Sequence, residues 1–177
     1  MVITRPNHDP TTTYLYFWSQ SVIDAAKKHT ISVIDVRGKR VTKKVVVGII
    51  DKTKPSFIFF NGHGNARTIC GYDNEPIIEF NTNESALRGA VIFARACQSA
   101  SELGPSCVAK GTKTYLGYTD DFIFLTEGKE SRALTDRVAK VFLEPSNQVA
   151  ISLIKGHCAY QANARSKEYF KRNMRKL

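Results

Sequence analysis

The sequence has few cysteines and no long hydrophobic run. Its four cysteines (Cys70, Cys97, Cys107 and Cys158) show no C-x-x-C spacing, which argues against a disulfide scaffold or a cysteine zinc site. The longest apolar run, residues 45–50, is far shorter than the about 18 residues that a membrane helix needs. Residues 1–6 lack the basic start, apolar stretch and cleavage site of a signal peptide. We therefore expect reduced thiols in a cytoplasmic protein with no membrane segment, no bound metal and no cofactor.

Internal repeats and linker-like stretches are also missing, so the 177 residues are expected to form one domain spanning positions 1–177. Apolar residues make up 42% and charged residues 24%, a mixture that excludes wholesale disorder. The net charge is +10, and two segments, residues 37–54 and 165–176, carry the excess of basic residues. Basic helices near Lys43 and Lys171 can attract nucleic acid or an acidic protein.

Short runs rich in β-branched and aromatic residues alternate with stretches of helical spacing, which predicts an α/β fold with a mostly parallel sheet between helices. The strands are expected at residues 2–4, 31–36, 56–60, 90–94 and 114–118, and a β-hairpin within residues 68–80. The helices are expected at residues 10–28, 42–54, 83–88 and from Cys97 to about residue 110, with two or three more at the C-terminal end, where Pro145 is expected to separate two of them.

Two of these strand ends carry residues suited to acyl transfer. His63 follows the third strand and Cys97 follows the fourth, and the carboxyl ends of parallel neighbours share one edge of a sheet. In such a reaction a thiolate at Cys97 attacks an acyl carbon, and the imidazole of His63 acts as general acid and base. We expect Cys97 to begin a helix, which favours its thiolate. The backbone N–H groups of Gly64 and Cys97 then form an oxyanion hole.

The pairs His63-Gly64 and Ala96-Cys97, each after a strand, resemble the His-Gly and Ala-Cys pairs of the caspase-like (clan CD) cysteine peptidases. This superfamily includes caspases, metacaspases, legumain, gingipain and the CHAT domains, and the order of elements along nearly the whole chain agrees with it. The resemblance implies a caspase-type three-layer α/β/α sandwich and a cysteine endopeptidase acting on polypeptides. Arg95 and Ser99 depart from the caspase signature Q-A-C-[RQG]-G, which argues against a true caspase.

The specificity pocket is less closely defined by the sequence. Alternation along a strand places Arg95 on the same side as Cys97, and the resemblance implies that this position lines the pocket for the residue before the scissile bond. A guanidinium there favours an acidic or amide side chain. Asp120 and Asp121, after the fifth strand, would instead favour arginine or lysine, and Asp9, after the first strand, is a third candidate. Because alternation places Arg95 more directly than the aspartates, we expect cleavage after an acidic or amide residue.

Two alternatives remain open. Arg95 can serve as the structural partner of an aspartate, and the chain can be an inactive scaffold that binds nucleic acid or an acidic protein through its basic helices. Cys70, Cys107 and Cys158 are expected to be packing thiols, with His157 and Cys158 as a weaker candidate dyad.

Overall fold

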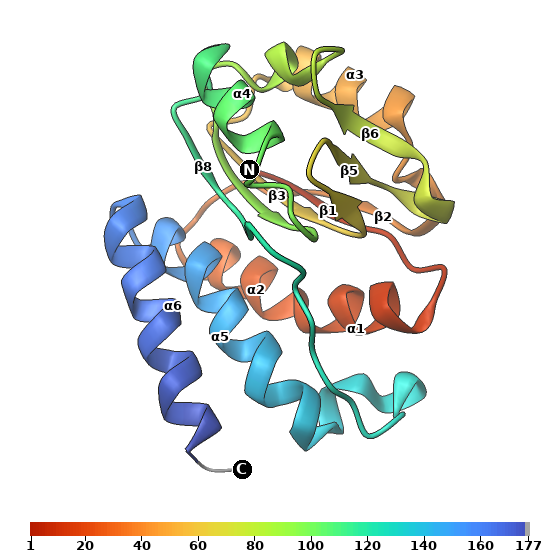
Figure 1. Cartoon of the computed structure of the whole chain (residues 1–177), viewed down its shortest axis with the longest axis vertical. Coiled ribbons are helices and arrows are strands. Elements are labelled where there is room, and N and C mark those ends of the chain that lie inside the picture. Colours follow the sequence, from red (N-terminus) through yellow and green to blue (C-terminus); the bar gives the residue numbers. More distant parts are fainter. Residues whose placement is uncertain (176–177) are drawn as a thin grey trace.

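The computed structural model describes residues 1–175 and contains a five-stranded parallel sheet with helices on both faces (Figure 1). The sheet has the strand order β2-β1-β3-β7-β8, and a second, antiparallel sheet has the order β4-β5-β6. The strands are β1 (Val2–Arg5), β2 (Ile34–Arg37), β3 (Phe57–Asn61), β4 (Gly64–Asn65), β5 (Thr68–Cys70), β6 (Pro76–Glu79), β7 (Val91–Arg95) and β8 (Thr114–Leu116).

The α-helices are α1 (Pro10–Trp18), α2 (Gln20–Lys28), α3 (Lys43–Thr53), α4 (Leu103–Ala109), α5 (Arg137–Ile154) and α6 (Ala159–Met174). Short 3₁₀ helices are η1 (Gly38–Arg40), η2 (Tyr72–Asn74), η3 (Glu84–Leu87) and η4 (Glu130–Thr135). The predicted α/β class and parallel sheet are confirmed, as is the hairpin, formed by β5 and β6.

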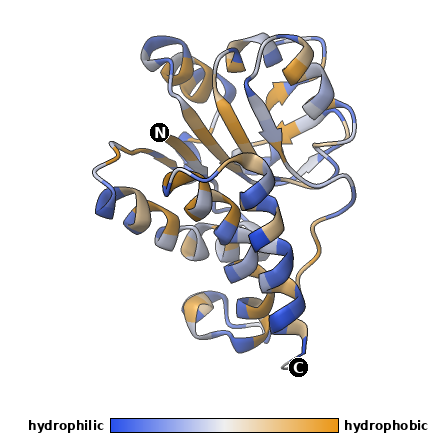
Figure 2. Ribbon diagram, turned by 90° about the vertical axis from the view of Figure 1, so that its left-hand side faces the viewer, coloured by the Kyte–Doolittle hydropathy of each residue, from blue (hydrophilic) through white to orange (hydrophobic). Residues whose placement is uncertain are grey.

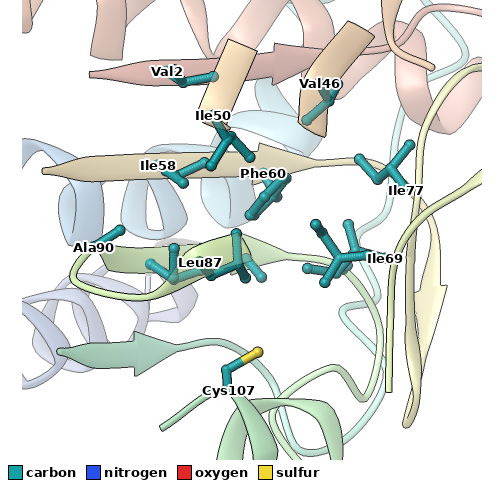
Figure 3. Packing of buried hydrophobic residues seen from close by; sticks show 14 of the residues in the cluster. Val2, Val46, Ile50, Ile58, Phe60, Ile69, Ile77, Leu87, Ala90 and Cys107 are labelled. Atoms are coloured by element: carbon teal, nitrogen blue, oxygen red, sulfur yellow. The ribbon is translucent and has the colours of Figure 1, made fainter. Parts of the chain in front are cut away.

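The central strands are hydrophobic on both sides because helices cover both faces of the sheet. Ile58, Phe59 and Phe60 of β3 are all fully buried. On one face, α3, α4 and the small antiparallel sheet enclose a core that contains Val46, Ile50, Ile69 and Cys107, among others (Figure 3). On the other face, α2, α5 and α6 pack against the sheet, and Figure 2 shows the apolar colouring concentrated in the strands.

Two helix boundaries differ from expectation. The helix predicted over residues 10–28 is divided at Ser19, which ends α1 and begins α2. Pro145 does not separate two helices, because it lies inside α5. A proline leaves the carbonyl four residues earlier without its helical donor, and here Asn173 Nδ2 of α6 donates to that carbonyl, Val141 O, at 3.5 Å. The neighbouring helix thus stabilises α5 across its proline.

Within residues 1–175, no helix combines the length and hydrophobicity needed to span a lipid bilayer.

Candidate functional site

The loops after β3 and β7 lie side by side at the carboxyl edge of the sheet. These strands are parallel neighbours, and their last residues, Asn61 and Arg95, are paired in register. The Gly62 N–H donates to the Arg95 carbonyl at 3.4 Å, which extends the contact beyond the strands. His63 and Cys97 each lie two residues past this last pair. The structure therefore brings the two loops together, as the sequence predicted.

Gly64 allows the close contact between these loops. A Cβ atom at this position would lie 2.7 Å from the Thr68 carbonyl oxygen and 2.9 Å from Ala96 Cβ. It would also lie 3.4 Å from the Cys97 carbonyl oxygen. Any side chain here would push the β3 loop away from the loop that carries Cys97.

His63 is oriented by Asp9, a residue from the loop between β1 and α1. Its Nε2 atom lies 2.7 Å from Asp9 Oδ2. Asp9 is the N-cap of α1, and its other oxygen, Oδ1, accepts from the Thr12 N–H at 2.7 Å and from the Thr12 hydroxyl at 2.9 Å. The helix cap thus fixes the carboxylate and leaves Oδ2 for the imidazole.

This geometry determines which nitrogen of His63 carries the proton. Burial acts to raise the pKa of Asp9, but hydrogen bonds from Thr12 and His63 outweigh it and hold that pKa below its ordinary value. The carboxylate therefore only accepts, so His63 Nε2 carries the hydrogen, and in the neutral form of the ring this tautomer leaves the lone pair on Nδ1. His63 is 36% exposed and Asp9 29% exposed, so a substrate can approach the pair. Asp9, one of the predicted pocket residues, thus contacts the imidazole of His63.

Cys97 does not begin a helix, contrary to the expectation. Residues 97–102 form turns, and α4 starts only at Leu103. Gln98 has a φ of +54°, which interrupts any right-handed helix at this point. The N–H groups of Gln98 and Ala100 donate to the carbonyls of Asp120 and Tyr118 at 3.0 Å each, so the segment after β8 covers this turn.

The thiol of Cys97 lies half-buried against this covering segment. Burial raises the pKa of the thiol above its ordinary value, and a hydrogen bond from the Phe122 N–H partly offsets this. The negative charge of Asp121, which accepts a hydrogen bond from the thiol, raises the pKa further. Asp121 is itself held by Gln98 Nε2 at 3.0 Å. The resting thiol is therefore protonated, and a base is needed to activate it.

Arg95 lies in the core and does not line a pocket. Its side chain is 0% exposed and packs with its guanidinium carbon 5.2 Å from the centre of the Phe59 ring. Its nitrogens donate to Asn61 Oδ1 at 2.6 and 2.9 Å and to Asn147 Oδ1 at 2.8 Å. The predicted substrate contact is wrong, because every polar group of this guanidinium faces the protein. The alternative of an aspartate partner is wrong too, since its acceptors are amides and the Leu15 carbonyl.

Asp120 and Asp121 remain available. Both are exposed and line a cavity of about 420 Å³ that extends between β8 and α6, where Lys167 also lines it. The charged residues that line this cavity are therefore Asp120, Asp121 and Lys167, and not Arg95; its lining residues do not include His63 or Cys97.

The remaining cysteines differ from Cys97 in their surroundings. Cys107 is buried in the core, where burial raises its pKa to about 12. Cys70 is half-buried in β5, and burial raises its pKa as well. Cys158 is exposed at the N-cap of α6.

No protein-family model matches the chain, and its comparison with curated proteins gives no match.

One residue of the site was missed by sequence reasoning. His8 precedes Asp9, and its ring stands edge-on to His63 with the centroids 6.1 Å apart. Its Nε2 atom lies 3.4 Å from Asp9 Oδ2. One ligand atom each from His8, Asp9 and His63 lies within 4.8 Å of the others, a spacing that can hold a metal ion. No sequence pattern pointed to His8, because His8 and Asp9 lie far from His63 along the chain.

Proposed function

We propose that this protein is a cysteine endopeptidase of the caspase-like type, with Cys97 as nucleophile and His63 as general acid and base. The observation that supports it best is the Asp9–His63 hydrogen bond of 2.7 Å beside the loop of Cys97. A carboxylate that orients an imidazole near a nucleophile is an arrangement that many acyl-transfer enzymes use.

The reaction follows from the assigned tautomer. His63 Nδ1 accepts the proton of the Cys97 thiol, and the sulfur forms a bond to the carbonyl carbon of the peptide. The resulting imidazolium is stabilised by Asp9. When the tetrahedral intermediate collapses, the C–N bond breaks and the imidazolium proton goes to the departing amine. Water, deprotonated by the same imidazole, then hydrolyses the thioester; the proton returns to the sulfur, and the acid product leaves.

Two further parts of the site belong to this proposal. The backbone N–H groups of Gly64 and Cys97 are proposed to bind the developing oxyanion, a contribution worth about 3 kcal/mol for one donor in known enzymes. The exposed carboxylates of Asp120 and Asp121 are proposed to bind a basic side chain before the scissile bond. Cleavage after arginine or lysine is therefore favoured over cleavage after an acidic or amide residue.

The direct test combines an acyloxymethyl-ketone probe with a peptide library. Wild-type protein and a Cys158→Ala variant should both be labelled and should cleave after basic residues, because Cys158 is exposed but distant in sequence from the site. Cys97→Ala should lose both labelling and cleavage. Equal labelling of Cys97→Ala and wild type would refute the proposed nucleophile.

A second candidate function is non-catalytic binding of an acidic protein or a nucleic acid. It is favoured by a groove along α6 lined by Arg165, Arg172 and Arg175, together with Tyr169. Lys171 also lines this groove but pairs with Glu168 at 2.9 Å. The basic segment at Lys43 supports it less, because Lys43 pairs with Glu79 at 2.7 Å. Affinity for RNA or DNA that falls steeply with salt, and falls in Arg172→Ala, would favour this function. An absence of binding at low salt would exclude it.

A further inference from the structure

We propose that His8, Asp9 and His63 form a binding site for a divalent transition-metal ion, for which Zn²⁺ is the best match. Two imidazoles and one carboxylate are ligands that zinc accepts, and three protein ligands leave a fourth position open for water. One ligand atom from each residue already lies within 4.8 Å of the other two.

The independent observation is the state of His8. Its side chain is only 8% exposed, yet within residues 1–175 neither ring nitrogen has a hydrogen-bond partner. Burying a polar group without a partner is unfavourable. A metal ion bound at Nε2 would satisfy the nitrogen that faces Asp9.

One of the three ligand–ligand distances already matches a tetrahedral ion. With metal–ligand bonds of about 2.0–2.1 Å, neighbouring ligand atoms lie about 3.3–3.4 Å apart. His8 Nε2 and Asp9 Oδ2 are already 3.4 Å apart. His63 Nε2 and Asp9 Oδ2 are closer, at 2.7 Å, because a hydrogen bond now joins them. A small rotation of the His63 ring, together with loss of its Nε2 proton, converts this hydrogen bond into two metal bonds.

The loop that carries two of the ligands is already ordered. The backbone N–H groups of His8 and Asp9 both donate to Thr12 Oγ1, at 3.0 and 3.1 Å. Thr12 also donates to Asp9 Oδ1, which orients the carboxylate as an outer-shell partner does in metal sites. The His8 ring packs against Tyr72, with centroids 5.2 Å apart. Metal binding therefore requires little ordering of the chain.

Metal binding would also control the proposed catalytic site. An ion on Nε2 of His63 displaces the proton from that nitrogen, and a neutral ring then carries its hydrogen on Nδ1. Nδ1 can no longer accept the proton of Cys97, so zinc would inhibit the peptidase reversibly. This consequence rests on the proposed function, whereas metal binding itself does not.

The test is a zinc titration of the untagged full-length chain, followed by competition with a chromophoric chelator. Wild type and Cys97→Ala should each bind one Zn²⁺ tightly, because Cys97 is not a ligand. His8→Ala should bind at least tenfold more weakly, while His29→Ala, which removes an exposed histidine, should bind as wild type does. A cooperative thermal unfolding transition without zinc, similar in wild type and His8→Ala, checks that the variant is folded, and zinc should raise the melting temperature of wild type only.

Three results would overturn the proposal. One is equal zinc affinity in wild type and His8→Ala. Another is loss of binding in Cys97→Ala but not in His8→Ala, which would place the ion between Cys97 and His63. The third is loss of binding in Cys158→Ala alone, which would place it at the C-terminal cysteine. Because chelator competition needs no substrate, a chain without peptidase activity can still confirm the metal site.

Discussion

Replacement of Arg95 tests whether this residue supports the fold and does not select substrates. Arg95→Met keeps an unbranched apolar stem but removes all donors from the buried guanidinium. Asn61 Oδ1 and Asn147 Oδ1 then lose their Arg95 hydrogen bonds inside the protein, where both residues are at most 2% exposed. A buried acceptor left without a donor costs about 1–3 kcal/mol, so two cost about 2–6 kcal/mol.

A second effect reduces this cost. Burial of the cation lowers the pKa of Arg95 to about 10, because removing the guanidinium from water is unfavourable. The methionine variant no longer carries this penalty. We therefore expect Arg95→Met to lower the free energy of unfolding by about 2 kcal/mol, the lower end of the range of about 2–6 kcal/mol given above.

Urea denaturation followed by circular dichroism measures this change. In the double variant Arg95→Met/Asn147→Leu, the loss of unfolding free energy should be smaller than the sum of the losses in the two single variants, by about 1 kcal/mol. The reason is that the double variant also removes Asn147 Oδ1, the acceptor that Arg95→Met leaves without a donor. Arg165→Met, an exposed position on α6, should change stability by less than about 0.5 kcal/mol. Stability of Arg95→Met equal to wild type, strict additivity of the pair, or an altered cleavage preference would refute the reasoning.

Three other predictions concern carboxylates. Asp9→Asn should keep the helix cap and the melting temperature but lower kcat by about 10²–10⁴-fold with little change in KM, as measured by steady-state kinetics. Asp121→Asn should lower the raised pKa of Cys97, so the pH profile of its alkylation by iodoacetamide should shift to lower pH; an unchanged profile would contradict this contact. Burial opposes ionisation of Glu84, but its hydrogen bonds with Lys110 and nearby groups lower its pKa from 4.5 to about 2. Its stabilisation is therefore complete above about pH 4.5 and lost as the pH falls toward 2, and acid titration of Glu84→Gln should lack this component.

The sequence by itself determined the strands and the residues at their carboxyl ends. Strands covered on both faces must be hydrophobic throughout, so runs such as residues 57–60 identify the sheet. Because parallel neighbours end at one edge, the positions of His63 and Cys97 also placed their loops together. Local signals were equally sound where they act within a few residues, as in the helix predicted from residue 42. There the Thr42 side chain accepts from the Val45 N–H and α3 begins at Lys43.

Only the tertiary structure decided what these residues contact. Alternation placed Arg95 beside Cys97, but β7 ends at Arg95 and a turn follows, so alternation does not continue to the cysteine. The contact between Asp9 and His63 joins residues 54 positions apart, and the donor to the carbonyl freed by Pro145 comes from another helix. Periodicity and capping reflect interactions between residues close in sequence, whereas these contacts depend on how whole helices and strands pack against one another.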